Sequence, residues 1–111
     1  MAININMSKK DLFNARSASR SIKDAIGKRL IVSGCAVVEG AGTDKQGNSC
    51  DVGYIATNEG VFGFTSNVIL KSMSDFADYL KETLDDGDVV TIEFFVGKTN
   101  SGTDFYNFQV V

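Results

Sequence analysis

The chain has 111 residues, carries a net charge of −3 and contains no His, Trp or Pro. The length suits a single domain, and 43% hydrophobic with 23% charged residues is typical of a globular chain. The absence of His excludes Ser-His-Asp and Cys-His catalysis and His-ligated metal sites. We therefore expect no enzyme, no metal, no cofactor and no small-molecule substrate.

Charge is divided unevenly along the chain. Residues 1–29 hold seven Lys or Arg and two Asp, a net +5, whereas residues 30–111 hold four Lys and twelve Asp or Glu, a net −8. The basic segment is rich in small residues without a clean period, so we interpret residues 1–27 as an extended, partly flexible arm before a domain at 28–111. The arm could lie along a phosphate backbone, or it could be a solvated segment whose positive charge offsets that of the acidic domain. Charge alone favours neither.

No apolar run approaches 18 residues, and the first ten residues lack the apolar core of a secretory signal. We expect no membrane span and a cytoplasmic protein. Its two cysteines, Cys35 and Cys50, are expected to be reduced and half-buried. Because they fall on neighbouring predicted strands, a regulatory disulfide between them stays open as an alternative.

Alternating apolar residues predict three strands in the first half of the chain, joined by a glycine-rich loop and a tight turn. In the first strand, the even-numbered residues from Leu30 to Val38 should share one face and Cys35 and Val37 the other. The predicted strands are Lys28 to Glu39, Ser49 to Thr57 and Val61 to Thr65.

The pattern then changes to a helical period. Ser72 to Asp75 has the form of a capping box, and Gly87 suits the helix end. The expected apolar stripe is Met73, Phe76, Ala77, Leu80 and Leu84. Two further strands should follow at Asp88 to Gly97 and Asp104 to Val111. Three strands, a helix and two strands is the order of the OB-fold, a five-stranded Greek-key barrel; an open α+β sheet is the alternative.

Aromatic residues give the clearest functional signal. Phe95 and Phe105 lie on strand faces otherwise made of polar residues, as a platform for stacking unpaired bases would. Alternatively, the two rings cover each other or meet a partner protein. Tyr54, Phe62 and Phe64 are ambiguous, because each has glycine as a neighbour and could serve either packing or close approach of a base.

Several short segments carry a family resemblance: Phe13-Asn14-Ala15; Ser21 to Asp24 before Gly27; Val52 to Ile55 through Asn58-Glu59-Gly60; Ser74 to Leu80; and Val96 to Gly102 before an aromatic-rich last strand. In pattern and spacing over residues 13–111, the chain resembles the small single-stranded DNA-binding proteins of podophages that replicate by protein priming. The resemblance implies an OB-fold that coats single strands during phage DNA replication, in the host cytoplasm, without sequence preference or catalysis. Self-association along the DNA is left open.

The family stacks bases on tyrosines of the barrel face, and here only Tyr54 lies in such a region, with Phe62 and Phe64 on the next strand. The stacking candidates are Tyr54, Phe62, Phe64, Phe95 and Phe105. The candidate phosphate contacts are Lys9, Lys10, Arg16, Arg20, Lys28 and Arg29, with Lys45 and Lys98 at the hairpin tips. The alternatives are an OB-fold protein–protein module, such as a phage inhibitor or structural component, and an RNA-binding OB domain.

Overall fold

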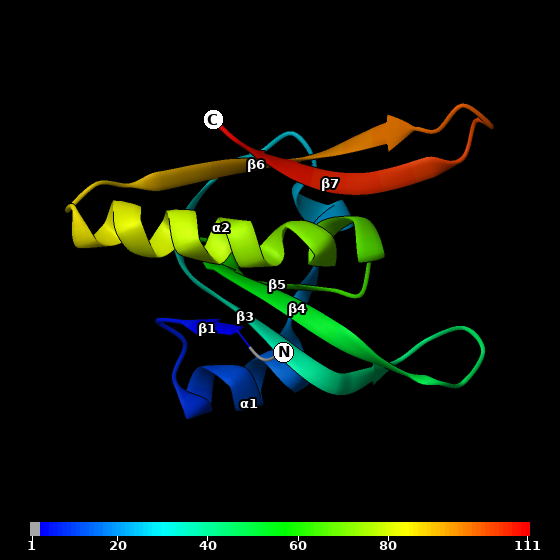
Figure 1. Ribbon diagram of the computed structural model, residues 1–111, viewed down its shortest axis with the longest axis horizontal. Coiled ribbons are helices and arrows are strands. Elements are labelled where there is room, and N and C mark those ends of the chain that lie inside the picture. Colours follow the sequence, from blue (N-terminus) through cyan, green and yellow to red (C-terminus); the bar gives the residue numbers. More distant parts are fainter. Residues whose placement is uncertain (1–2) are drawn as a thin grey trace.

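The computed structural model describes residues 3–111 and is mainly β, with a curled, half-barrel sheet and two α-helices (Figure 1). Its elements are β1 (Ile3–Ile5), α1 (Lys9–Ala18), β2 (Arg20–Ser21), the 3-10 helix η1 (Ile22–Ala25), β3 (Arg29–Thr43), β4 (Ser49–Thr57), β5 (Gly60–Phe64), α2 (Asn67–Asp85), β6 (Val90–Lys98) and β7 (Asp104–Val110). Within the described range this makes seven strands and two α-helices, where the sequence predicted five strands and one. The additional elements all lie before β3.

The long strand β3 organises the sheet. It pairs with β4 along one edge and with β6 and then β1 along the other, always antiparallel. β4 pairs with β5 and β6 with β7, also antiparallel, whereas β2 adds to β5 in parallel. The Gly27 N–H then donates to the Phe94 carbonyl at 3.1 Å. Residues 20–27 therefore link β5 to β6 and bring the two arms of the curl together.

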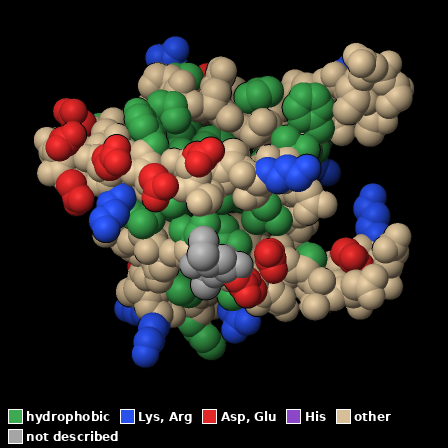
Figure 2. Space-filling model, viewed as in Figure 1, with side chains coloured by type: hydrophobic (Ala, Val, Ile, Leu, Met, Phe, Trp, Pro, Cys, Tyr) green, Lys and Arg blue, Asp and Glu red, His purple; other side chains and the backbone are tan. Residues whose placement is uncertain are grey.

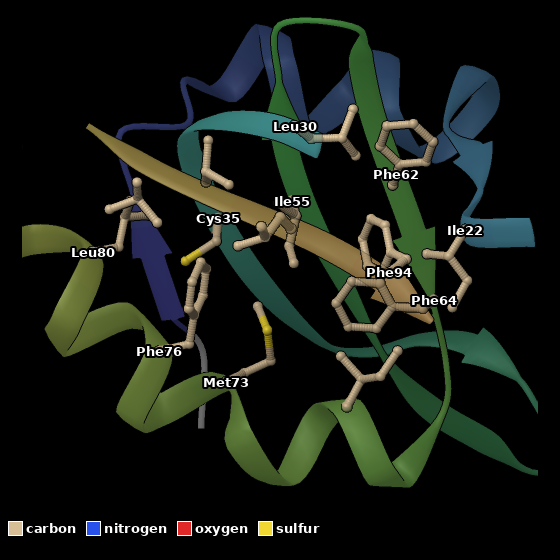
Figure 3. Packing of buried hydrophobic residues seen from close by; sticks show 14 of the residues in the cluster. Ile22, Leu30, Cys35, Ile55, Phe62, Phe64, Met73, Phe76, Leu80 and Phe94 are labelled. Atoms are coloured by element: carbon tan, nitrogen blue, oxygen red, sulfur yellow. The ribbon is translucent and has the colours of Figure 1, made fainter. Parts of the chain in front are cut away.

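The helix α2 lies in the hollow of the sheet, and we call the sheet face toward it the inner face (Figure 1). The predicted stripe is confirmed, because Met73, Phe76, Ala77 and Leu80 are buried. Figure 3 shows Met73, Phe76 and Leu80 pointing from α2 toward the sheet. The Phe76 ring packs edge-on against Phe108 at 4.8 Å between centroids. Burial of one helical face thus holds α2 in the sheet and forms the main core.

The C-terminal end of α2 was predicted correctly, whereas its N-terminal start was not. Gly87 has a φ of +81° and follows the last turn, as predicted from its freedom to adopt a left-handed conformation. The predicted capping box at Ser72 is wrong, because α2 begins at Asn67 and the Ser72 hydroxyl donates to the Ile69 carbonyl inside the helix. Ile69 lies one turn before Met73 on the same buried face, so core packing extends the helix toward its N-terminus.

A bulge in β3 changes which residues face the core. The register between β3 and β4 shifts between Val32 and Gly34. Before the bulge Leu30 and Val32 point inward, and after it Cys35 and Val37 do so. The sequence prediction of one unbroken alternation is therefore wrong beyond the bulge. One additional residue reverses the faces of everything that follows, because side chains alternate with a period of two.

The segment before β3 is folded rather than extended, which corrects the prediction for the basic arm. The Asn4 side chain holds the turn after β1 through two hydrogen bonds to the Met7 backbone. A capping box then starts α1: the Ser8 hydroxyl accepts from the Asp11 N–H, and the Asp11 carboxylate accepts from the Ser8 N–H. These bonds, first that from the Ser8 backbone, hold the pKa of Asp11 below 3.8. Local hydrogen bonds thus define where α1 begins.

α1 packs on the outer face of the sheet, opposite α2. Ala15 of α1 is buried there with Met7, Ala36 and Tyr54, in a second and smaller core. Ile22 and Ala25 of η1 belong to the main core. Residues 3–27 therefore contribute side chains to both cores.

The two cysteines lie too far apart for a disulfide. Cys35 is paired with Ile55, whereas Cys50 lies opposite Gly42. The five residues from Cys50 to Ile55 span roughly 17 Å of strand, at about 3.3 Å each. Bridged cysteines need Cα atoms within about 7 Å, so the pairing that the sequence left open is wrong for this fold. Cys35 is fully buried, which raises the pKa of its thiol from 9.0 to about 12.

Candidate nucleic-acid interface

Three of the five predicted stacking rings are buried. Tyr54, Phe62 and Phe64 are only 3%, 0% and 7% exposed. Phe62 and Phe64 both point to the inner face, where Phe62 packs against Phe94 at 5.7 Å between centroids. Tyr54 points outward but lies in the small core under α1. None of the three offers a free ring face to a base, so in this conformation their prediction as stacking residues is wrong.

The other two candidates lie on the outer face of β6 and β7. Their neighbours Phe94 and Phe108 point into the core, so Phe95 and Phe105 point away from it, as predicted. Both rings are half-buried. Phe95 lies opposite Asn107, and Gly97 lies opposite Phe105. The two pairs are neighbours on the same face of the sheet, two residues apart along each strand. This diagonal relation places the two aromatic residues about 7–8 Å apart on one surface.

Gly97 leaves the space that the Phe105 ring occupies over the neighbouring strand. A Cβ atom added at Gly97 would overlap with the Phe105 ring, so the ring occupies the space that a side chain would take. The absence of a side chain allows an aromatic ring to cover the backbone of the neighbouring strand. The arrangement presents a supported, partly accessible aromatic surface.

Polar and charged side chains surround this aromatic surface, which comprises Phe95 and Phe105. Asn107 and Gln109 share the outer face, and Arg29 of β3 pairs directly with Glu93 of β6. Amide and guanidinium groups can donate hydrogen bonds to phosphate or base oxygens. Glu93 offsets part of the positive charge of Arg29.

The two hairpins that carry the predicted tip lysines extend toward the same side of the molecule (Figure 1). The Asp44 carboxylate orders the β3–β4 loop by accepting from the Gln46 and Asn48 N–H groups, and Lys45 is exposed in that turn. Lys98 ends β6 and contacts the Asp104 carboxylate at 2.9 Å. Lys45 is therefore available to an anion, whereas Lys98 already has a counter-charge.

The remaining predicted cations come from several elements. Lys9, Lys10 and Arg16 belong to α1, and Lys28 and Arg29 are exposed where β3 begins. Arg20 lies over the Phe62 ring at 5.3 Å and donates to the Glu59 carbonyl, so its guanidinium already has partners. Acidic side chains gather along α2, while basic ones surround α1 (Figure 2). α2 carries four carboxylates and two lysines, whereas α1 carries three cations and one carboxylate.

The sequence reasoning missed the most exposed aromatic residue, Phe13. Phe13 on α1 is 73% exposed and lies between Lys9 and Arg16 on the same side of the helix. The signal was present in the sequence, because the capping box from Ser8 to Asp11 marks a helix start. The spacing of Lys9, Phe13 and Arg16 then places all three on one helical face.

Comparison with known proteins identifies no relative: no family model, curated protein or solved structure matches the chain. Across residues 3–111, the structure has no helix with the length and apolar character needed to cross a membrane. In the same range, acidic and cysteine side chains form no group of three or more that could hold a metal ion.

Proposed function

We propose that this protein is a non-catalytic, OB-fold-like protein that binds single-stranded DNA without sequence preference. The strand pairings support this fold: β3 pairs with both β4 and β6, β4 with β5, β6 with β7, and α2 lies between β5 and β6. They are consistent with the partly open, five-stranded Greek-key barrel of an OB-fold. Its role would be to coat single strands during phage DNA replication in the host cytoplasm.

The Phe105 ring on Gly97 is the observation that carries the proposal. A phenylalanine on a polar strand face exposes apolar surface to water without completing a core. Stacking against an unpaired base contributes about 1–3 kcal/mol and does not depend on which base is present. Phe95 extends the same aromatic surface, and Asn107 and Gln109 can bond to the strand that lies across it.

Charge separation supports single strands as the ligand. The cations at the start of β3 and on α1 can neutralise a flexible backbone that bends toward them. The carboxylates along α2 repel a rigid duplex that approaches from that side (Figure 2).

A protein–protein module is the second candidate. It is favoured by carboxylates beside the cations near the aromatic surface: Lys98 forms an ion pair with Asp104, and Arg29 lies opposite Glu93 on the neighbouring strand. Exposed aromatic rings with polar and charged residues around them also match the apolar core and polar rim of a protein–protein interface. This candidate predicts no binding to oligo(dT) at low salt. RNA binding would be recognised by competition between DNA and RNA strands of equal length.

Substitutions at Phe105 test the proposal. Phe105→Ala and Phe105→Leu should each weaken oligo(dT) binding roughly 5- to 150-fold, the equivalent of about 1–3 kcal/mol. Phe105→Leu keeps an apolar cover on Gly97, and Phe105→Tyr keeps the ring, so Tyr alone should retain wild-type affinity. Unchanged affinity with a lowered thermal midpoint in the Ala variant would instead assign Phe105 to packing.

A further inference from the structure

A groove runs between α1 and β3 on the outer face of the sheet. It has a volume of about 330 Å³ and is lined by Lys9, Leu12, Phe13, Arg16 and Val38. This volume falls at the lower end of the range for small-ligand pockets, about 300–1,000 Å³. The groove is separate from the aromatic surface of β6 and β7 and contains none of its residues.

The groove exists because α1 contacts the sheet through Ala15 and Leu12 and not through its largest apolar side chain, Phe13. Ala15 is buried against the sheet and Leu12 is half-buried, whereas Phe13 stays at the edge and is 73% exposed. A helix that served only to cover the sheet would turn its largest apolar side chain inward. The position of Phe13 therefore leaves an accessible ring beside an apolar wall.

Two cations flank this ring. Lys9 lies one turn before Phe13 and Arg16 one turn after it, both exposed and both lining the groove. Neither forms an ion pair with another residue of the described range 3–111. Arg can hold a phosphate through two parallel hydrogen bonds, and Lys supplies a point charge. An aromatic ring between two unpaired cations matches the alternation of base and phosphate in a single strand.

We propose that this groove is a second nucleotide subsite, in which Phe13 stacks on a base while Lys9 and Arg16 contact the adjoining phosphates. The inference rests on the proposed function and names a further part of the surface that the strand would follow. The Phe13 ring between two cations favours a nucleotide, whose planar base adjoins phosphates, over an apolar peptide or an uncharged acyl chain, which would leave both cations without an anion.

A tryptophan reporter tests stacking at this position, because the chain contains no Trp of its own. In Phe13→Trp, oligo(dT) should quench the indole emission, and quenching should saturate at the concentrations where a gel shift reports binding. Val89→Trp is the matched control, since Val89 is also exposed, at 64%, but lies in the connection between α2 and β6. Its emission should not change.

A charge pair provides the second readout. Arg16→Gln should reduce the steepness of log affinity against log salt by about 0.7, the value for one phosphate contact on a single strand. Lys71→Gln removes the same charge from α2 and should leave the slope unchanged. Binding of oligo(dT) without quenching in Phe13→Trp, or equal slopes in the two charge variants, would overturn the subsite alone. No binding by the wild type would overturn the proposed function and the subsite together.

Discussion

The two faces of the curled sheet differ in how completely they are covered. On the inner face, α2 buries a continuous stripe of large side chains, and the rings of Phe62, Phe94 and Phe108 pack in series. On the outer face, α1 buries only Ala15 among its own residues, and β6 and β7 leave Phe95 half-exposed. Both faces carry aromatic residues: Phe62 and Phe94 on the inner face are fully buried, whereas Phe95 and Phe105 on the outer face are half-buried.

This difference separates residues that determine the fold from residues free to bind. An aromatic side chain on the inner face is explained by packing and needs no ligand. The same residue type on the outer face exposes apolar area to water, and binding of a ligand would cover that area. Changes on the inner face should therefore alter stability first, and changes on the outer face should alter binding first.

The largest contrast is expected between two leucines, one in each helix. Leu80→Ala opens a cavity in the main core and should lower the free energy of unfolding by about 2–5 kcal/mol. Leu12 of α1 is half-buried, so Leu12→Ala should cost less than half as much. Urea denaturation measures both values. Equal losses would show that α1 is as integral to the fold as α2.

The sequence predicted much of the inner face and little of the outer one. The stripe from Met73 to Leu80 has a clear helical period, and the alternation that puts Phe95 and Phe105 on polar faces leaves Phe94 and Phe108 for the core, where the structure has them. The bulge after Val32 has no signature in an alternating run, so the faces of Cys35 and Val37 were reversed. Register depends on the partner strand, which local pattern does not contain.

Only part of the outer site was predicted, because local pattern does not show which strand faces are covered. The polar faces around Phe95 and Phe105 showed correctly that the two rings point outward. The cover over Tyr54 could not be found from periodicity, because α1 is short and has a weak apolar pattern. Whether a strand face is open or covered depends on tertiary packing, and that information lies in distant residues.

Two glycines, one under a ring on each face, give the next largest contrast between the inner and outer faces. A Cβ at Gly53 would overlap with the buried Phe64 ring, just as one at Gly97 would overlap with the Phe105 ring. Gly53→Ala should therefore destabilise the protein by about 1–3 kcal/mol, the usual cost of overpacking, since the core ring cannot move aside. Gly97→Ala should cost less, because Phe105 can turn toward solvent, and should weaken oligo(dT) binding. Thermal melts and gel shifts together measure the pair. A larger stability loss in Gly97→Ala would reverse the assignment of faces.

The buried thiol of Cys35 makes stability depend on alkaline pH. Its pKa is about 12 in the folded protein and 9.0 as the ordinary value. The folded state therefore keeps a proton that the unfolded state loses, and stability falls as pH rises from about 9 toward 12. The loss should be about 1 kcal/mol at pH 10. Urea denaturation of the wild type and of Cys35→Ala at pH 8 and pH 10 checks this. An equal pH dependence in both proteins would contradict it.

The smallest effect is expected at the start of α1. Ser8→Ala removes the capping box and should loosen α1 by about 1 kcal/mol, without changing the main core. Acid should also loosen α1. Because the pKa of Asp11 is lowered in the folded protein, its carboxylate stabilises α1 above pH 3.8, and this stabilisation is lost as the pH falls below that value. Amide hydrogen exchange should accelerate in α1 and stay unchanged in α2. Uniform acceleration would show that the two helices unfold together.

Binding to single strands compared with duplex, each across a salt titration, tests the central claim most directly. If four to six of the cations contact phosphates, log affinity for oligo(dT) against log salt should have a slope of about −3 to −4, at ~0.7 per phosphate. The duplex of the same length should bind more weakly at every salt concentration. Equal affinity for both forms, or no binding to oligo(dT) at low salt, would contradict the account.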